Sequence, residues 1–63
     1  MNEMGFNPAV VAYICERLRG GISDSRITGE LLRPDDPLFL PINNDLGVAI
    51  SYLAYGKKVC NGK

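Results

Sequence analysis

The feature that most constrains this chain is its shortness, because 63 residues can build only a small hydrophobic core. A domain of about 60 residues buries only about 60% of the surface that its unfolded chain exposes, so its stability is marginal. Such domains usually gain stability from disulfides, a structural metal or a second subunit. With two cysteines, no histidine and no C-x-x-C pair, a zinc site is not expected. We therefore expect a homodimer or a complex with a larger protein.

The two cysteines are expected to be reduced thiols. Cys15 falls in a strongly helical stretch, and Cys60 lies near the polar C-terminal end. A single pair of cysteines does not make the disulfide framework that stabilises small secreted domains. The sequence also has no apolar run of about 18 residues and no signal-peptide pattern. These observations predict a cytoplasmic chain that does not span a membrane.

Local signals predict a first helix over residues 8–19. Asn7 can cap the N-terminus with its side-chain oxygen, and Pro8 suits the first helical position because it lacks an N–H group. Gly20 and Gly21 end the helix, since glycine adopts the left-handed conformation at little cost. The apolar residues recur at helical spacing and form one stripe: Val10, Val11, Ile14 and Leu18.

A second helix is predicted from Asp24 to about Arg33. Ser23 is its N-cap, and the negative charge of Asp24 favours the positive end of a helix. Ile27 and two later leucines form its inner face. Pro34 ends the helix near Arg33, because a residue that precedes proline is disfavoured in the α conformation.

A proline-rich connector and a third helix follow. Residues 35–41 hold two of the four prolines and predict an extended connector whose central Leu-Phe-Leu sequence packs on the core. The Asn-Asn-Asp sequence at 43–45 offers alternative N-caps for a helix that Gly56 ends. Residues 1–6 are expected to be a leader that is loose as far as Gly5, and residues 57–63 a polar tail that frays or forms a short strand. The expected fold is all-α: one compact three-helix domain with a proline-rich connector between helices two and three.

The composition argues against an enzyme and against a cofactor. Seven basic and seven acidic side chains give no formal net charge, which removes the general attraction to phosphate that many nucleic-acid binders show. No histidine is available as a base near neutral pH, and no glycine-rich phosphate loop is present. The adjacent acids Asp35 and Asp36 are interpreted as solvated turn formers. We expect neither catalysis nor a bound cofactor or metal.

The segment AYICERLRGGISDSRITGELL, residues 12–32, has the pattern of a capped helix pair. One helix ends in glycine, an apolar residue and a serine cap follow, and Ile27 stands four positions after Ser23. The segment resembles the opening of the helix-turn-helix domains of quorum-sensing-type regulators and the tryptophan repressor. The resemblance implies a small dimeric DNA-binding regulator, in which residues 46–58 form the helix that contacts bases. The candidate DNA-contacting residues are Ser25, Arg26, Ser51, Lys57 and Lys58.

The third helix supports a second interpretation, a small inhibitor or adaptor that covers a site on a larger protein. This helix is apolar almost all round, and so small a core cannot hold all of its side chains. Because exposed aromatic side chains are favoured at protein interfaces, the candidate interface residues are Val48, Tyr52 and Tyr55. Alternatively, these side chains fill the core beneath the connector. Small size and the lack of catalytic groups suit a phage or mobile-element protein under either interpretation.

Overall fold

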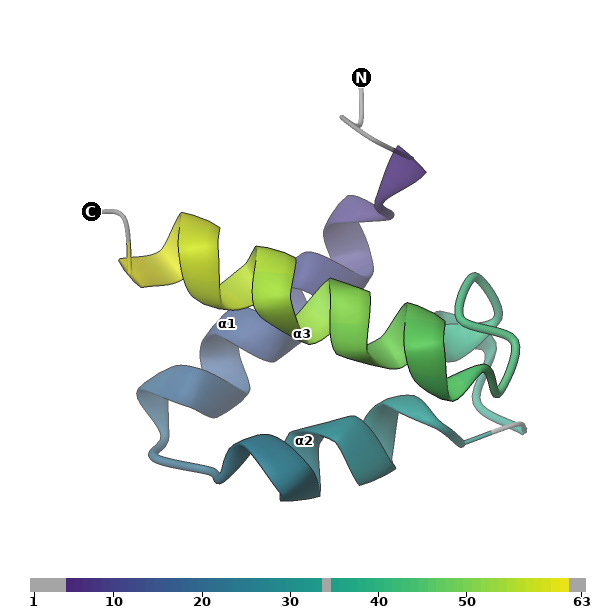
Figure 1. The fold of residues 1–63 in the computed structure, drawn as a ribbon, viewed down its shortest axis with the longest axis horizontal. Coiled ribbons are helices and arrows are strands. Elements are labelled where there is room, and N and C mark those ends of the chain that lie inside the picture. Colours follow the sequence, from purple (N-terminus) through teal and green to yellow (C-terminus); the bar gives the residue numbers. More distant parts are fainter. Residues whose placement is uncertain (1–4, 34, 62–63) are drawn as a thin grey trace.

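The start and stop signals of the sequence produce three α-helices in the computed structural model, which describes residues 5–33 and 35–61 (Figure 1). The elements follow in the order α1, α2, η2 and α3, where η2 is one turn of 3-10 helix. Their bounds are Pro8–Arg19 for α1, Asp24–Leu31 for α2, Pro37–Phe39 for η2 and Leu46–Asn61 for α3. No strand occurs among the described residues, so the expected all-α, three-helix fold is confirmed.

Helix α1 has the predicted bounds, because its cap and its stop signal both act locally. The side-chain oxygen of Asn7 accepts a hydrogen bond from the backbone N–H of Ala9 at 2.9 Å. At the other end, the N–H of Gly20 donates to carbonyls of the last turn, and Gly21 takes a positive φ of 79°. Glycine adopts this conformation without strain, so the chain turns sharply toward α2.

Helix α2 begins as predicted but ends at Leu31 rather than near Arg33. The Oγ of Ser23 caps the helix by accepting from the N–H of Arg26 at 3.3 Å. The residue after the helix, Leu32, closes the last turn by donating its N–H to a carbonyl in that turn. Arg33 precedes a proline, a position that disfavours the α conformation, so the helix stops before it.

The connector is not extended, so this part of the prediction is wrong. Asp36 caps η2, because its Oδ1 accepts from the N–H of Leu38 at 3.1 Å and its carbonyl accepts from the N–H of Phe39 at 3.0 Å. The φ that proline imposes suits a 3-10 turn as well as an extended chain. Phe39 and Ile42 are buried, whereas Leu40 is 65% exposed. The expectation that the whole Leu-Phe-Leu sequence packs on the core therefore fails at Leu40.

Helix α3 is capped by Asp45, the last of the three alternative caps. Its Oδ1 accepts from the N–H of Val48 at 3.2 Å, and its carbonyl accepts from the N–H of Ala49 at 2.9 Å. Asn43 and Asn44 both take a φ of 57° and belong to the turn before the helix. Asparagine tolerates this left-handed conformation better than most residues, which leaves the capping role to Asp45.

Gly56 does not end the third helix, which corrects the expected boundary. Helix α3 continues to Asn61, so residues 57–61 are helical rather than a polar tail. The rest of the expected tail, residues 62–63, and residues 1–4 of the expected leader lie outside the described part of the chain. A Cβ atom at Gly56 would lie 2.6 Å from Cγ2 of Ile14. This glycine therefore permits the close approach of α1 and α3 instead of terminating a helix.

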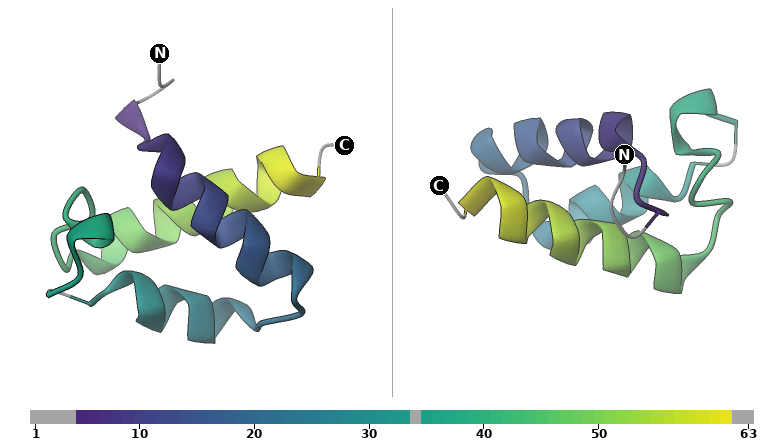
Figure 2. Two further views of the ribbon diagram at one scale, coloured as in Figure 1. Left: turned by 180° about the vertical axis from the view of Figure 1, so that it is seen from behind. Right: turned by 90° about the horizontal axis from the view of Figure 1, so that it is seen from above.

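The core lies where α3 crosses α1 and runs beside α2 in the roughly opposite direction (Figures 1 and 2). Each helix and the connector contribute apolar side chains to it, so the core depends on all of these elements. Its buried residues are Val10, Ile14, Ile27, Leu31, Phe39, Ile42, Ala49, Tyr52 and Leu53.

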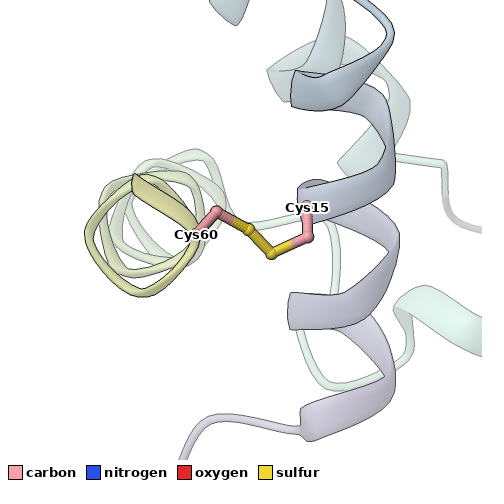
Figure 3. The surroundings of a disulfide bond; sticks show 2 residues. All are labelled: Cys15 and Cys60. Atoms are coloured by element: carbon pink, nitrogen blue, oxygen red, sulfur yellow. A yellow bond between two sulfur atoms is a disulfide. The ribbon is translucent and has the colours of Figure 1, made fainter. Parts of the chain in front are cut away.

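A disulfide joins Cys15 of α1 to Cys60 in the last turn of α3 (Figure 3). The expectation of two reduced thiols is therefore wrong. The two Cα atoms are 5.8 Å apart, within the usual range of about 4.4–6.8 Å for bridged cysteines. The two residues are 45 positions apart in the sequence, and only the crossing of α1 and α3 brings them together.

Candidate functional site

One side of α3 faces away from the core and carries exposed apolar residues. Leu46 is 55% exposed, and Ile50, one turn later, is 52% exposed. Ala49 and Leu53, three positions after Leu46 and Ile50, are buried, so these exposed residues begin where the covered side of the helix ends. Residues three or four positions apart are neighbours on a helix surface. We define the outer face of α3 by its exposed residues at this spacing: Leu46, Gly47, Ile50, Ser51, Ala54 and Lys58.

Small residues occupy much of the outer face. Gly47, Ser51 and Ala54 are all exposed, and they lie beside or beyond the two large apolar side chains. The distance between the axes of packed helices, about 8–10 Å, depends on the size of the side chains at the contact. Small residues on this face therefore allow the backbone of another helix to approach closely.

The two ends of the outer face carry charges of opposite sign. At the N-terminal end, Oδ1 of Asp45 lies 3.4 Å from the position that a Cβ atom on Gly47 would occupy. The carboxylate is favourable there, since the helix dipole is positive at the N-terminus. At the C-terminal end, Lys58 is exposed. The acidic cap Asp45 thus precedes the outer face, whose middle is apolar and small and whose last residue, Lys58, is basic.

Tyr52, expected to be an exposed interface anchor, is instead buried, with 3% of its surface exposed. Its hydroxyl accepts a hydrogen bond from the backbone N–H of Asn7 at 2.7 Å. A buried tyrosine hydroxyl usually needs such a partner. The prediction that Tyr52 is exposed is wrong, because the residue that caps α1 supplies that partner from within the same chain.

The other two interface candidates are partly covered by the chain itself. Tyr55 stacks on Phe6, with ring centroids 4.5 Å apart. Phe6 also meets Tyr52 edge-on at 4.9 Å, so the last residue of the expected leader packs on α3. Val48 is partly buried against the core. The large apolar side chains that α3 exposes most are Leu46 and Ile50, neither of which is among the three candidates.

Sequence reasoning missed Leu46, because periodicity cannot orient a helix that is apolar almost all round. Small residues gave no signal either, because α3 carries them both on its buried side, at Ala49 and Gly56, and on its exposed side, at Gly47 and Ala54.

The structure brings Lys57 to the first turn of α2, where Ser25 and Arg26 also lie. Both cations have carboxylate partners. The Nζ of Lys57 is 2.7 Å from Oδ2 of Asp24, and Nε of Arg26 is 3.5 Å from Oε2 of Glu30. These contacts offset much of the positive charge that phosphate binding would use.

The remaining two DNA candidates, Ser51 and Lys58, lie on the outer face of α3 and are exposed. They stand on a different element from Ser25 and Arg26, so the five candidates do not share one helix. Among the exposed residues of the outer face, Lys58 alone has a long polar side chain. Direct recognition of base edges relies on arginine, lysine, asparagine and glutamine, so the face offers little for it.

Glu30 forms a polar cluster between α1 and α2 that sequence reasoning did not identify. Its Oε1 accepts from the hydroxyl of Tyr13 at 2.7 Å and from Nε of Arg17 at 3.0 Å. Its Oε2 accepts from Nη2 of Arg17 at 2.7 Å. The hydrogen bonds from Arg17 and Tyr13 lower the pKa of Glu30 to about 2. The carboxylate therefore stays ionised and bonded at neutral pH, which suits a link between two helices.

Residues 5–33 and 35–61 contain neither a candidate metal site nor a helix that could cross a membrane. No group of three or more histidine, cysteine, aspartate or glutamate side chains in these ranges could hold a metal ion. Within the same part of the chain, no helix combines the length and the apolar character that crossing a membrane requires.

Comparisons of the chain with protein-family models, curated proteins and solved structures found no match. The resemblance of residues 12–32 to helix-turn-helix domains therefore stays a prediction from the sequence. Among residues 5–33 and 35–61, the outer face of α3 holds the two most exposed large apolar side chains of any α-helix.

Proposed function

We propose that this chain is a small non-catalytic binding protein that docks onto another protein through the outer face of α3. The observation that carries the proposal is the exposure of Leu46 and Ile50, which lie one turn apart and are each more than half exposed. Contiguous exposed apolar residues often mark interaction sites on small proteins. Because full burial of a leucine or isoleucine contributes about 1.5–3 kcal/mol, a partner that covers both side chains gains a substantial part of that energy.

DNA binding, the other function expected from the sequence, has less support. The chain has no formal net charge, and two of the three candidate cations, Arg26 and Lys57, lie beside carboxylates. The carboxylate of Asp45, just before the outer face of α3, would repel phosphate. We therefore prefer a protein partner. The cytoplasmic location and the phage or mobile-element setting remain predictions from the sequence.

A photo-crosslinking amino acid at position 50 tests the proposal, and the same group at position 59 is the matched control. Val59 is also an apolar residue of α3, 43% exposed, but it lies outside the outer face. We expect protein adducts from position 50 and not from position 59. The purified partner should then bind the Ile50→Asp variant about tenfold more weakly or worse, and the Val59→Asp variant normally. Unchanged binding of the Ile50→Asp variant would contradict the proposal.

A gel-shift assay at low salt on the same proteins separates the two functions. DNA binding that is lost in Lys58→Glu but kept in Ile50→Asp would favour the DNA-binding regulator instead, because a phosphate contact depends on the cation and not on the apolar residue. The proposal expects no such shift at any ionic strength.

A further inference from the structure

We propose that the protein accepted by the outer face of α3 is a second copy of this chain, with the two α3 helices packed antiparallel about a twofold axis near Ile50. This inference rests on the proposed function, since it uses the same surface. A twofold interface uses the same patch on both subunits, so the patch must be complementary to itself. The outer face meets that requirement in both shape and charge.

Its shape is complementary because the large Leu46 falls opposite a small residue on each side of a central Ile50 pair. In an antiparallel pair centred on Ile50, a residue some positions before Ile50 faces the residue that lies the same number of positions after Ile50 in the second copy. Leu46, four positions before Ile50, then faces Ala54 of the second copy, four positions after it. The two Ile50 side chains meet at the axis, and Gly47 leaves room for the facing backbone. This alternation allows the close packing that helix pairs need.

Its charge is complementary because Asp45 and Lys58 stand at opposite ends. With a rise of about 1.5 Å per residue, Asp45 lies about 7.5 Å before the centre and Lys58 about 12 Å after it. A helical side chain leans toward the N-terminus of its own helix, so the lysine stem covers the difference of about 4.5 Å. The ammonium group of Lys58 thus reaches the carboxylate of Asp45 on the second copy, and the symmetry forms this pair twice.

The Asp45 carboxylate can cap α3 and bind Lys58 of the second copy at the same time. Its Oδ1 accepts from the N–H of Val48 at 3.2 Å, and the other oxygen can accept from a lysine. The formal net charge of zero adds no overall repulsion between identical copies.

Sedimentation equilibrium of the wild-type chain, Ile50→Glu and Val59→Glu tests the inference. The wild type should be a dimer at micromolar concentration. Ile50→Glu places two carboxylates at the axis and should raise the dimer dissociation constant about tenfold or more. Val59→Glu should remain a dimer. Circular dichroism should show all three proteins folded, because both substituted side chains are about half exposed.

A charge reversal tests the antiparallel arrangement. Lys58→Glu should weaken the dimer, because it places a carboxylate beside Asp45 of the second copy. Adding Asp45→Asn should restore part of the affinity, since asparagine keeps the helix cap but removes the repulsion. No recovery in the double variant would overturn the antiparallel pairing.

The outcomes distinguish this inference from the proposed function. A wild-type chain that stays monomeric up to millimolar concentration would overturn the inference. If position 50 still crosslinked to a different protein, the proposed function would stand and only the inference of a second copy would fail. A monomer that gave no protein adduct at position 50 would overturn both.

Discussion

At the scale of single residues, Gly56 and Gly29 should respond oppositely to the same substitution. A Cβ atom at Gly56 would lie 2.6 Å from Cγ2 and 3.1 Å from Cβ of Ile14, whereas one at Gly29 would meet nothing within 4 Å. Gly56→Ala should therefore destabilise the fold by about 1–3 kcal/mol through overpacking. Gly29→Ala should stabilise it by about 0.5–1 kcal/mol through better helix propensity. Urea denaturation measures both changes, and a gain of stability in both variants would refute the close packing at Gly56.

At the scale of the elements, Glu30 links α1 to α2 by accepting hydrogen bonds from Tyr13 and Arg17. The pKa of Glu30 falls from 4.5 to about 2 in the folded chain. A carboxyl with a depressed pKa contributes stability that is fully present above its unfolded pKa. That contribution is lost as the pH falls from 4.5 toward about 2.

Replacement of Glu30 by glutamine should flatten this pH dependence. We expect Glu30→Gln to be less stable than the wild type at pH 6 and to lose less further stability between pH 4.5 and pH 2, the range that the two pKa values define. Urea midpoints measured across that range provide the test. Glu16→Gln is the matched control, because Glu16 is an exposed residue of α1 outside the cluster. If the stability of Glu30→Gln depended on pH in the same way as that of the wild type, the Glu30 cluster would not be the source of this pH dependence.

At the scale of the whole molecule, the Cys15–Cys60 disulfide ties the middle of α1 to the end of α3 across 45 residues. In the chain-entropy account, closing a loop of about that length stabilises the fold by about 4 kcal/mol. The core of so small a domain rarely contributes more than about 3–5 kcal/mol. The free energy that the disulfide contributes is therefore comparable with that of the core of the monomer.

Reduction should consequently lower the melting temperature sharply. For a domain of this size each 1 kcal/mol shifts Tm by about 4–8 °C, so we expect a fall of about 15 °C or more with a reducing agent. The double variant Cys15→Ser with Cys60→Ser should melt as low as the reduced wild type and should not respond to the reducing agent. Thermal melts followed by circular dichroism measure this. Equal melting temperatures for the oxidised and reduced wild type would show that the bridge adds no stability.

The sequence by itself determined the helical fold class and the ends of α1 and α2 that depend on local bonds. Asn7 and Ser23 cap their helices by accepting from residues two or three positions away. Such bonds need no distant partner, so a pattern of caps and glycines is sufficient to locate them. The excess of apolar residues on α3 was also visible in the sequence, and it correctly indicated that not all of them are buried.

Only the tertiary structure decided which side of α3 is covered. The crossing with α1 buries Tyr52, turns Gly56 into a contact with Ile14 and brings the two cysteines together. Each of these features joins positions more than 40 residues apart, and the periodicity of a single helix carries no information about its neighbour. The same crossing leaves Leu46 and Ile50 exposed, because α1 and α2 cover only the side of α3 that holds Ala49, Tyr52 and Leu53.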